Sequence, residues 1–276
     1  IPAASRDAFL VGFRFPNMLR DLIGEGAANA AFVPVFSESQ EKDTEAEYRA
    51  LVSASMSAML IVLGVITVAG LLLIPALLNS LDQLSTLTRE APVTDERAQQ
   101  LIEISLWTFP YIFLIGMTVF CTGPLFAAGR YAVPSWSPAI LNVALIVACT
   151  TLYDRFADPA YALVVGVWVG GVLTLIVQYW AMGRASGVWL PNFRLNHPAL
   201  RTIFLLLLPV ILGQAAGELN KLVDLLFAAS LPIGTVTVLF YANRLVQLPL
   251  SLFGVATQVA VLPALSRANA RGDTAE

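Results

Sequence analysis

The sequence has 276 residues, of which 57% are hydrophobic and 13% are charged, and its formal net charge is −3. A soluble domain has about 25% charged residues, so this composition excludes an ordinary soluble globular protein. The mean hydropathy of +0.74 instead predicts an all-α polytopic membrane protein, because helices satisfy their own backbone polar groups inside a bilayer.

Few residues are available for metal or nucleophile chemistry. The two cysteines, Cys121 and Cys149, lie in apolar runs and are expected to be buried thiols, and His197 is the one histidine. This supply does not fit a disulfide framework, a zinc motif or a histidine metal site. We therefore expect no metal centre and no organic cofactor.

The first long element, residues 7–37, carries ionisable residues at membrane depth. They are Asp7, Arg14, Arg20, Asp21 and Glu25. A charge at the bilayer centre costs roughly 2.5–3.5 kcal/mol on insertion scales, so the element is expected to line a polar cavity inside a bundle. Pro16, Gly24 and Gly26 are expected to interrupt it. A surface amphipathic helix with ordinary ion pairs is the alternative.

The periodicity of this element places its charges on different faces. At about 100° per residue, Asp7, Arg14, Asp21 and Glu25 share one face of an ideal helix. Arg20 falls about 120° away from that face by the same periodicity. A break at Pro16 could bring Arg20 round, and the sequence leaves this open.

Seven apolar segments of sufficient length predict seven helical crossings. They are residues 7–37, 51–78, 107–128, 132–153, 160–183, 202–230 and 235–266. Prolines within the spans should kink them. These prolines are Pro110, Pro124, Pro138, Pro209, Pro249 and Pro263.

Basic residues in the links between spans predict the orientation. If residue 37 faces the cytoplasm, four basic residues lie outside, namely Arg6, Arg89, Arg97 and Arg155. Eight then lie inside, namely Lys42, Arg49, Arg130, Arg184, Arg194, Arg201, Arg267 and Arg271. This excess agrees with the positive-inside rule.

The span at residues 202–230 carries a second charged group, Glu218, Lys221 and Asp224, at intervals of three residues. Glu218 and Lys221, or Lys221 and Asp224, can pair within a helix. The group is therefore either a self-neutralising structural cluster or a site for a coupling cation.

An internal repeat supports a two-lobed transporter. The pattern Ala27-x3-Ala31-x2-Pro34-x2-Ser37 recurs as Ala256-x3-Ala260-x2-Pro263-x2-Ser266. Repeated lobes with a ligand site between them are typical of transporters.

The run DAFLVGFRFPNMLRDLIGEGAANAAFVPVFSE resembles the MurJ (MviN) family of lipid II flippases, within the multidrug/oligosaccharidyl-lipid/polysaccharide (MOP) exporter superfamily. Further matches are Phe109-Pro110-Tyr111, Pro138-x2-Leu141-Asn142, Gly170-Gly171-Val172-Leu173 and Tyr241-Ala242-Asn243-Arg244-Leu245. The resemblance implies fourteen helices in two lobes, of which this chain matches helices two to eight. Residues 1–190 would form the N-terminal lobe without its first helix, with five to six crossings. Residues 198–276 would begin the C-terminal lobe with two.

The resemblance also implies a function. The family moves the undecaprenyl-pyrophosphate-linked peptidoglycan precursor, lipid II, from the inner to the outer leaflet of the bacterial cytoplasmic (inner) membrane during cell-wall synthesis. Lipid II and membrane lipids are the expected partners. We expect a monomer without enzymatic activity and without nucleic-acid binding.

The resemblance assigns roles to particular residues. Arg20 and Arg244 match arginines that hold the headgroup, Arg14 matches a basic cavity position, and Asp7 matches an acidic position near the outer gate. Asn17 and Glu25 lie in the matched motifs and are assigned to the same substrate site. Asp224 matches an aspartate that binds Na⁺ in some members, so Na⁺ is a candidate coupling ion. Its co-ligands are expected beyond residue 276.

Structural alternatives stay open for the two headgroup arginines. Arg20 can pair with Asp21 or Glu25, and Arg244 can snorkel to the outer interface. Two other functions also stay open, another exporter of the superfamily (for O-antigen-type lipid oligosaccharides or drugs) and a membrane enzyme of glycolipid assembly. The enzyme is disfavoured because the sequence has no glycine-rich phosphate loop.

Overall fold

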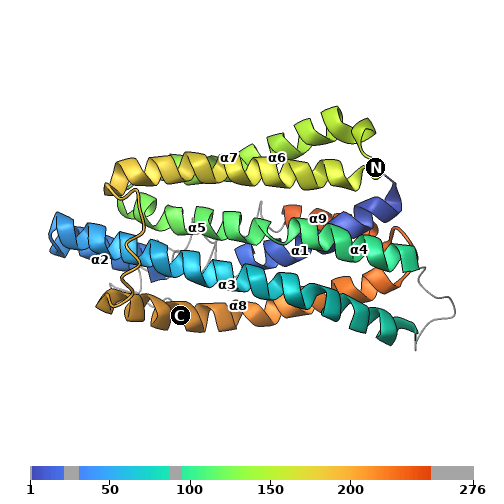
Figure 1. The fold of residues 1–276 in the computed structure, drawn as a ribbon, viewed down its shortest axis with the longest axis horizontal. Helices are drawn as coiled ribbons and strands as arrows, with labels where there is room; N and C mark the ends of the chain where they lie inside the picture. Colours follow the sequence, from blue (N-terminus) through green and yellow to red (C-terminus); the bar gives the residue numbers. More distant parts are fainter. Residues whose placement is uncertain (1, 22–30, 87–94, 250–276) are drawn as a thin grey trace, which may run out of the picture.

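The computed structural model describes residues 2–21, 31–86 and 95–249, and the regular elements in these ranges are all helices (Figure 1). In chain order they are α1 (Ala3–Asp21), α2 (Val33–Lys42), α3 (Glu45–Thr86), α4 (Asp95–Thr108), α5 (Tyr111–Ala127), α6 (Ala132–Leu152), the 3₁₀ turn η2 (Tyr153–Arg155), α7 (Ala160–Ser186), α8 (Pro198–Ser230) and α9 (Thr235–Pro249). The predicted all-α fold class is confirmed.

Five helical stretches are long and apolar enough to cross a membrane. They are Glu45–Ala76, Gln99–Ala127, Ala132–Arg155, Ala160–Ser186 and Pro198–Ala228. Each coincides with a predicted span, so five of the seven predictions are confirmed. For the other two, α1 and α2 cover parts of the first span and α9 covers the start of the last. The remaining residues of both, including the second copy of the repeat, lie outside the described residues.

The helices extend further than the predicted spans because helical structure continues beyond the apolar core. α2 runs to Lys42 and α3 begins at Glu45, so the predicted link of residues 38–49 shrinks to two residues. α3 has 42 residues, about 63 Å at 1.5 Å per residue. The hydrocarbon core is about 30 Å thick. α3 therefore reaches well beyond the apolar layer.

The predicted prolines act in two ways. Pro110 ends one helix and begins another, because it lies between α4 and α5 as the N-cap of α5. Pro124, Pro138, Pro209 and Pro249 lie inside helices. Pro263 lies outside the described residues.

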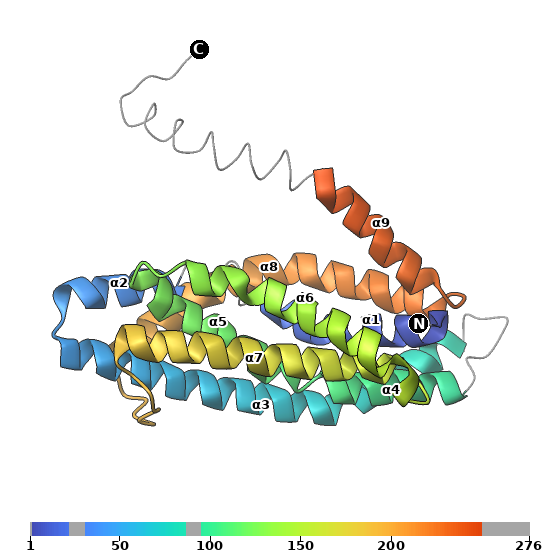
Figure 2. The same cartoon turned by 90° about the horizontal axis from the view of Figure 1, so that it is seen from above.

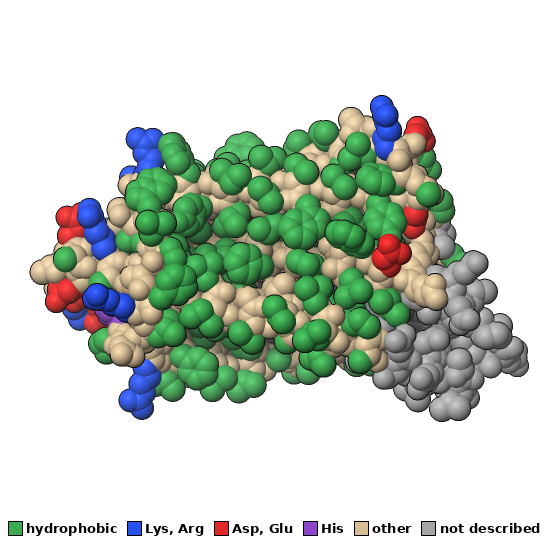
Figure 3. Space-filling view, in the orientation of Figure 1, with side chains coloured by type: hydrophobic (Ala, Val, Ile, Leu, Met, Phe, Trp, Pro, Cys, Tyr) green, Lys and Arg blue, Asp and Glu red, His purple; other side chains and the backbone are tan. Residues whose placement is uncertain are grey.

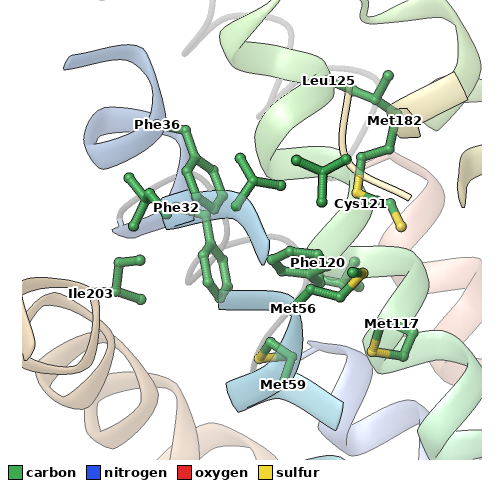
Figure 4. Packing of buried hydrophobic residues seen from close by; sticks show 14 of the residues in the cluster. Phe32, Phe36, Met56, Met59, Met117, Phe120, Cys121, Leu125, Met182 and Ile203 are labelled. Atoms are coloured by element: carbon green, nitrogen blue, oxygen red, sulfur yellow. The ribbon is translucent and has the colours of Figure 1, made fainter. Parts of the chain in front are cut away.

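The centre of the bundle is the α4–α5 span, in which 72% of an 18-residue apolar segment is buried. The largest apolar cluster packs around α5 and includes Phe32, Phe36, Met56, Phe120 and Cys121 (Figure 4). Gly123 allows α2 to approach, because a Cβ atom there would lie 2.9 Å from atoms of Phe32 and Phe36. Cys121 is buried as predicted, whereas Cys149 on α6 is only partly buried.

α1 lies inside the bundle and packs against α4, α5, α8 and α9. Asp7, Ala8 and Val11 are each at most 2% exposed. The predicted interior helix is therefore confirmed and the surface-helix alternative is wrong. The predicted interruption at Pro16 is also wrong, because α1 continues through it. A proline removes one backbone hydrogen bond, and packing by neighbouring helices can hold such a helix together.

Charged side chains gather toward the ends of the molecule, and the face in Figure 3 is apolar between them. At one end the α7–α8 link lies against α3, where Ser53 donates to the Leu190 carbonyl at 2.8 Å and the Phe193 N–H donates to Ser57 at 2.9 Å. The turn before α7 and the turn before α9 lie at the opposite end (Figure 1). The alternation of the links therefore agrees with the predicted topology.

Candidate functional site

The acidic residue of α1, Asp7, caps a helix far away in the sequence. Its carboxylate accepts hydrogen bonds from the Gly234 N–H at 2.6 Å, the Thr237 N–H at 3.0 Å and the Thr237 hydroxyl at 2.7 Å. These donors belong to the turn before α9 and to its first helical turn. A carboxylate there satisfies orphan N–H groups and interacts favourably with the helix dipole. Asp7 thus joins α1 to α9 at the predicted outer end.

Gly234 makes this cap possible through its backbone conformation. Its φ is +98°, a region that side-chain-bearing residues rarely adopt. The α8–α9 turn therefore requires glycine at the position whose N–H reaches Asp7. Figure 2 shows α9 leaving this turn at an angle to the other helices.

One helical face of α1 carries a second polar link. Arg14, two turns after Asp7, forms an ion pair with Glu218 of α8. The same Glu218 carboxylate accepts from Lys221 at 2.6 Å. The predicted shared face of Asp7 and Arg14 is confirmed, because Asp7 contacts α9 and Arg14 contacts the adjoining helix α8. The predicted Glu218–Lys221 pair is confirmed as well.

A cavity of about 300 Å³ lies between α1, α8 and α9. Its polar lining residues are Arg14, Asn17, Lys221, Asp224, Asn243, Arg244 and Gln247. Its apolar lining residues are Leu10, Phe13, Leu225, Val236, Leu239 and Phe240. The positively charged side chains of Arg14, Lys221 and Arg244 thus line one cavity, which suits an anionic ligand.

Arg244 reaches this cavity from α9. Its guanidinium carbon lies 5.4 Å from the centre of the Phe240 ring, in a cation–π arrangement. The residue is exposed, so its donors remain accessible. A cavity position agrees with the predicted headgroup role, and the alternative of snorkelling to the interface stays open.

Asn17 lines the same cavity. Its Oδ1 atom is buried and has no hydrogen-bond partner within the described part of the chain. A buried polar atom without a partner costs about 1–3 kcal/mol. The position of Asn17 in the cavity lining agrees with its predicted assignment to the substrate site.

Asp224 lies one turn beyond Lys221 and also lines the cavity. It is exposed, and among the described residues Lys221 pairs with Glu218 rather than with Asp224. Its carboxylate is therefore accessible to a cation. The described residues contain no cluster of three or more His, Cys, Asp or Glu side chains that could hold a metal ion.

Two predicted site residues cannot be placed by their side chains. Arg20 belongs to α1, and its side chain lies outside the described part, as does that of Asp21. Glu25 falls in residues 22–30, also outside it. Sequence reasoning missed that Glu218 binds Arg14 and that Lys221 lines the cavity. The signal was present, since both are ionisable residues within an apolar span.

The family profile described as "MurJ: Lipid II flippase MurJ" matches residues 3–276. The chain belongs to the MurJ family of lipid II flippases. It is 31% identical to the "Probable lipid II flippase MurJ" of Haemophilus influenzae over 99% of this chain and 54% of that protein. It is 32% identical to the "Lipid II flippase MurJ" of Burkholderia cenocepacia over 98% of this chain and 52% of that protein. The chain thus spans about half the length of these curated relatives.

A solved structure shows the same fold. The "Lipid II flippase MurJ, inward closed conformation" aligns with a TM-score of 0.76 at 22% identity, covering 96% of this chain and 53% of the solved chain. This likeness shows that the predicted all-α transmembrane bundle has the fold of a solved MurJ structure. The boundary between the lobes, predicted between residues 190 and 198, stays a prediction.

Proposed function

We propose that this chain forms half of a transporter that moves lipid II from the inner to the outer leaflet of the bacterial cytoplasmic membrane. The observation that carries the proposal is the cavity between α1, α8 and α9, in a chain of the MurJ family. Its arginines suit a pyrophosphate, because a guanidinium offers planar, bidentate donors to phosphate oxygens.

Alternating access needs contacts that close one side of the cavity and can be released. The Asp7 cap on α9 would be such a contact at the predicted outer end, because it holds α1 against the α8–α9 turn. Opening to the outer leaflet would break this cap. Asp224 would bind Na⁺ as the coupling ion, with further ligands from beyond residue 276.

The headgroup role is tested at Arg20 and Arg244. Arg→Ala at either residue, in the complete protein, should abolish complementation of a flippase-depleted strain. Arg→Lys should keep part of the function, since lysine offers a point charge without the bidentate fork. The loss in lipid II binding should be on the order of 1–3 kcal/mol, the range for charge-assisted hydrogen bonds. Both variants should still insert and fold.

The matched control is Arg155→Ala, on an exposed loop at the predicted outer end. It should complement fully and bind lipid II as the parent does. Full complementation by both alanine variants at normal expression would refute the pyrophosphate clamp. It would leave Arg20 and Arg244 as structural or interfacial residues.

A further inference from the structure

Glu218 is an unusual residue for its helix. Only 6% of an 18-residue apolar segment of α8 is buried, yet Glu218 is 5% exposed. A buried carboxylate is costly unless cations and hydrogen bonds compensate it. Here Arg14 from α1 and Lys221 from α8 provide that compensation.

The two cations around Glu218 resemble a phosphate site. Both lie on the wall of the cavity, and the side chain of Lys221 is 54% exposed. An anion in the cavity can therefore approach Lys221 without rearrangement of the backbone. In this structure the two carboxylate oxygens of Glu218 contact Arg14 and Lys221. Two oxygens of a phosphate group would bind at the same place.

The charges of the cavity leave room for an additional anion. Among the described residues in and beside the cavity, Arg14, Lys221 and Arg244 carry three positive charges, whereas Glu218 and Asp224 carry two negative ones. The excess of one positive charge lies in a space with many apolar lining residues, where electrostatic attraction is stronger than in water. Arg14 and Lys221 can therefore attract a phosphate group even while Glu218 is present.

We propose that Arg14 and Lys221 form an anion subsite whose occupant alternates between the Glu218 carboxylate and a phosphate group of the substrate. This inference rests on the proposed function and assigns a binding role to Lys221 and a competing role to Glu218. When the phosphate takes Arg14, the ion pair between α1 and α8 is lost. Headgroup binding thereby loosens one of the two polar links that join α1 to α8 and α9.

The decisive variant is Glu218→Gln in the complete protein, which keeps the shape of the side chain and removes its charge. Its affinity for inorganic pyrophosphate, measured by calorimetry, should rise roughly tenfold, because a competing charge-assisted bond to Arg14 is weakened. In unliganded Glu218→Gln, the distance distribution between spin labels at Arg155 and Ile233, both at the predicted outer end, should be broader than in the unliganded parent. In the parent protein, saturating pyrophosphate should shift the distribution toward that of the variant.

Lys221→Gln is a second variant that should fold, because Lys221 is half exposed. It should weaken pyrophosphate binding roughly tenfold through loss of a charge-assisted contact. Glu38→Gln is the matched control, since Glu38 pairs with Lys42 at 2.7 Å on an exposed surface far from the cavity. It should change neither the affinity nor the distances.

The opposite results would overturn the inference. If Glu218 only neutralises its neighbours, Glu218→Gln will lower the melting temperature while the pyrophosphate affinity stays at or below that of the parent. Unchanged affinity in Lys221→Gln would also refute the subsite. Lipid II flipping by the parent in proteoliposomes is measured separately. If the parent does not flip lipid II while pyrophosphate still competes with Glu218 for Arg14 and Lys221, the proposed function is refuted and the subsite is not.

Discussion

At the scale of single residues, the charged side chains of α1 serve as contacts between distant parts of the chain. Asp7 accepts three hydrogen bonds from the start of α9, and Arg14 pairs with Glu218 of α8. Because these residues lie seven positions apart, they are on one helical face. The desolvation cost of each charge is offset by its partner, so neither residue needs to face lipid.

Replacement of Asp7 tests the cap on α9. Asp7→Ala should lower the free energy of unfolding by about 2–3 kcal/mol, because buried donors lose a charged acceptor. Thermal unfolding of the complete protein in detergent measures the loss. Ser5→Ala, a buried polar position of the same helix, should cost clearly less. An equal loss for both variants would show that the cap contributes nothing specific.

Asp224 gives a second prediction at this scale. We expect Na⁺ to raise the melting temperature of the parent, and Asp224→Asn should weaken that rise without unfolding the bundle, because the residue is exposed. Melting curves in sodium and in choline chloride measure the effect. Asp154→Asn, on an exposed turn, should behave as the parent does. The same sodium dependence in parent and Asp224→Asn would leave Asp224 without a role as an ion ligand.

At the scale of elements, the sequence located helices better than it located their partners. Hydropathy and length identified five spans because an apolar stretch must cross the membrane as a helix. The partner of Arg14 lies 204 residues away, and those of Asp7 lie 227 and 230 residues away. Helical periodicity indicates a face of α1, but not which later helix will pack against it. Only the local Glu218–Lys221 pair was within reach of that reasoning.

The packing of α1 against α4 depends on a close approach at Gly12. A Cβ atom there would lie 3.0 Å from the Cα atom of Ser105. Gly12→Val should therefore force the two helices apart and cost about 1–3 kcal/mol, the range for overpacking. Gly64→Val is the control, because a Cβ atom at Gly64 meets nothing within 4 Å. Equal melting temperatures for the two variants would contradict the close contact.

At the scale of the whole molecule, the arrangement of the ends agrees with a membrane-crossing bundle. The α2–α3 turn and the link from α7 to α8 share one end, where Arg49 and Arg184 line the same cavity. The η2 turn lies at the other end, where Gln100 of α4 binds Asp158. Successive links lie at alternate ends because each long apolar helix crosses the bundle once. The choice of the cytoplasmic end rests on the excess of basic residues in the links.

Labelling of single cysteines decides that choice. In the complete protein with Cys121 and Cys149 replaced by alanine, cysteines at the exposed residues Glu41 and Asn192 should stay unlabelled by a membrane-impermeant maleimide in intact spheroplasts. Cysteines at Arg155 and at Glu90, in the predicted outer link, should react. Lysis should expose the first two, because only the membrane separates them from the reagent. The reverse pattern, with Glu41 and Asn192 reactive before lysis, would invert the orientation. It would also place the Asp7 cap on the cytoplasmic side, which would contradict the proposed closure of the outer end by this cap.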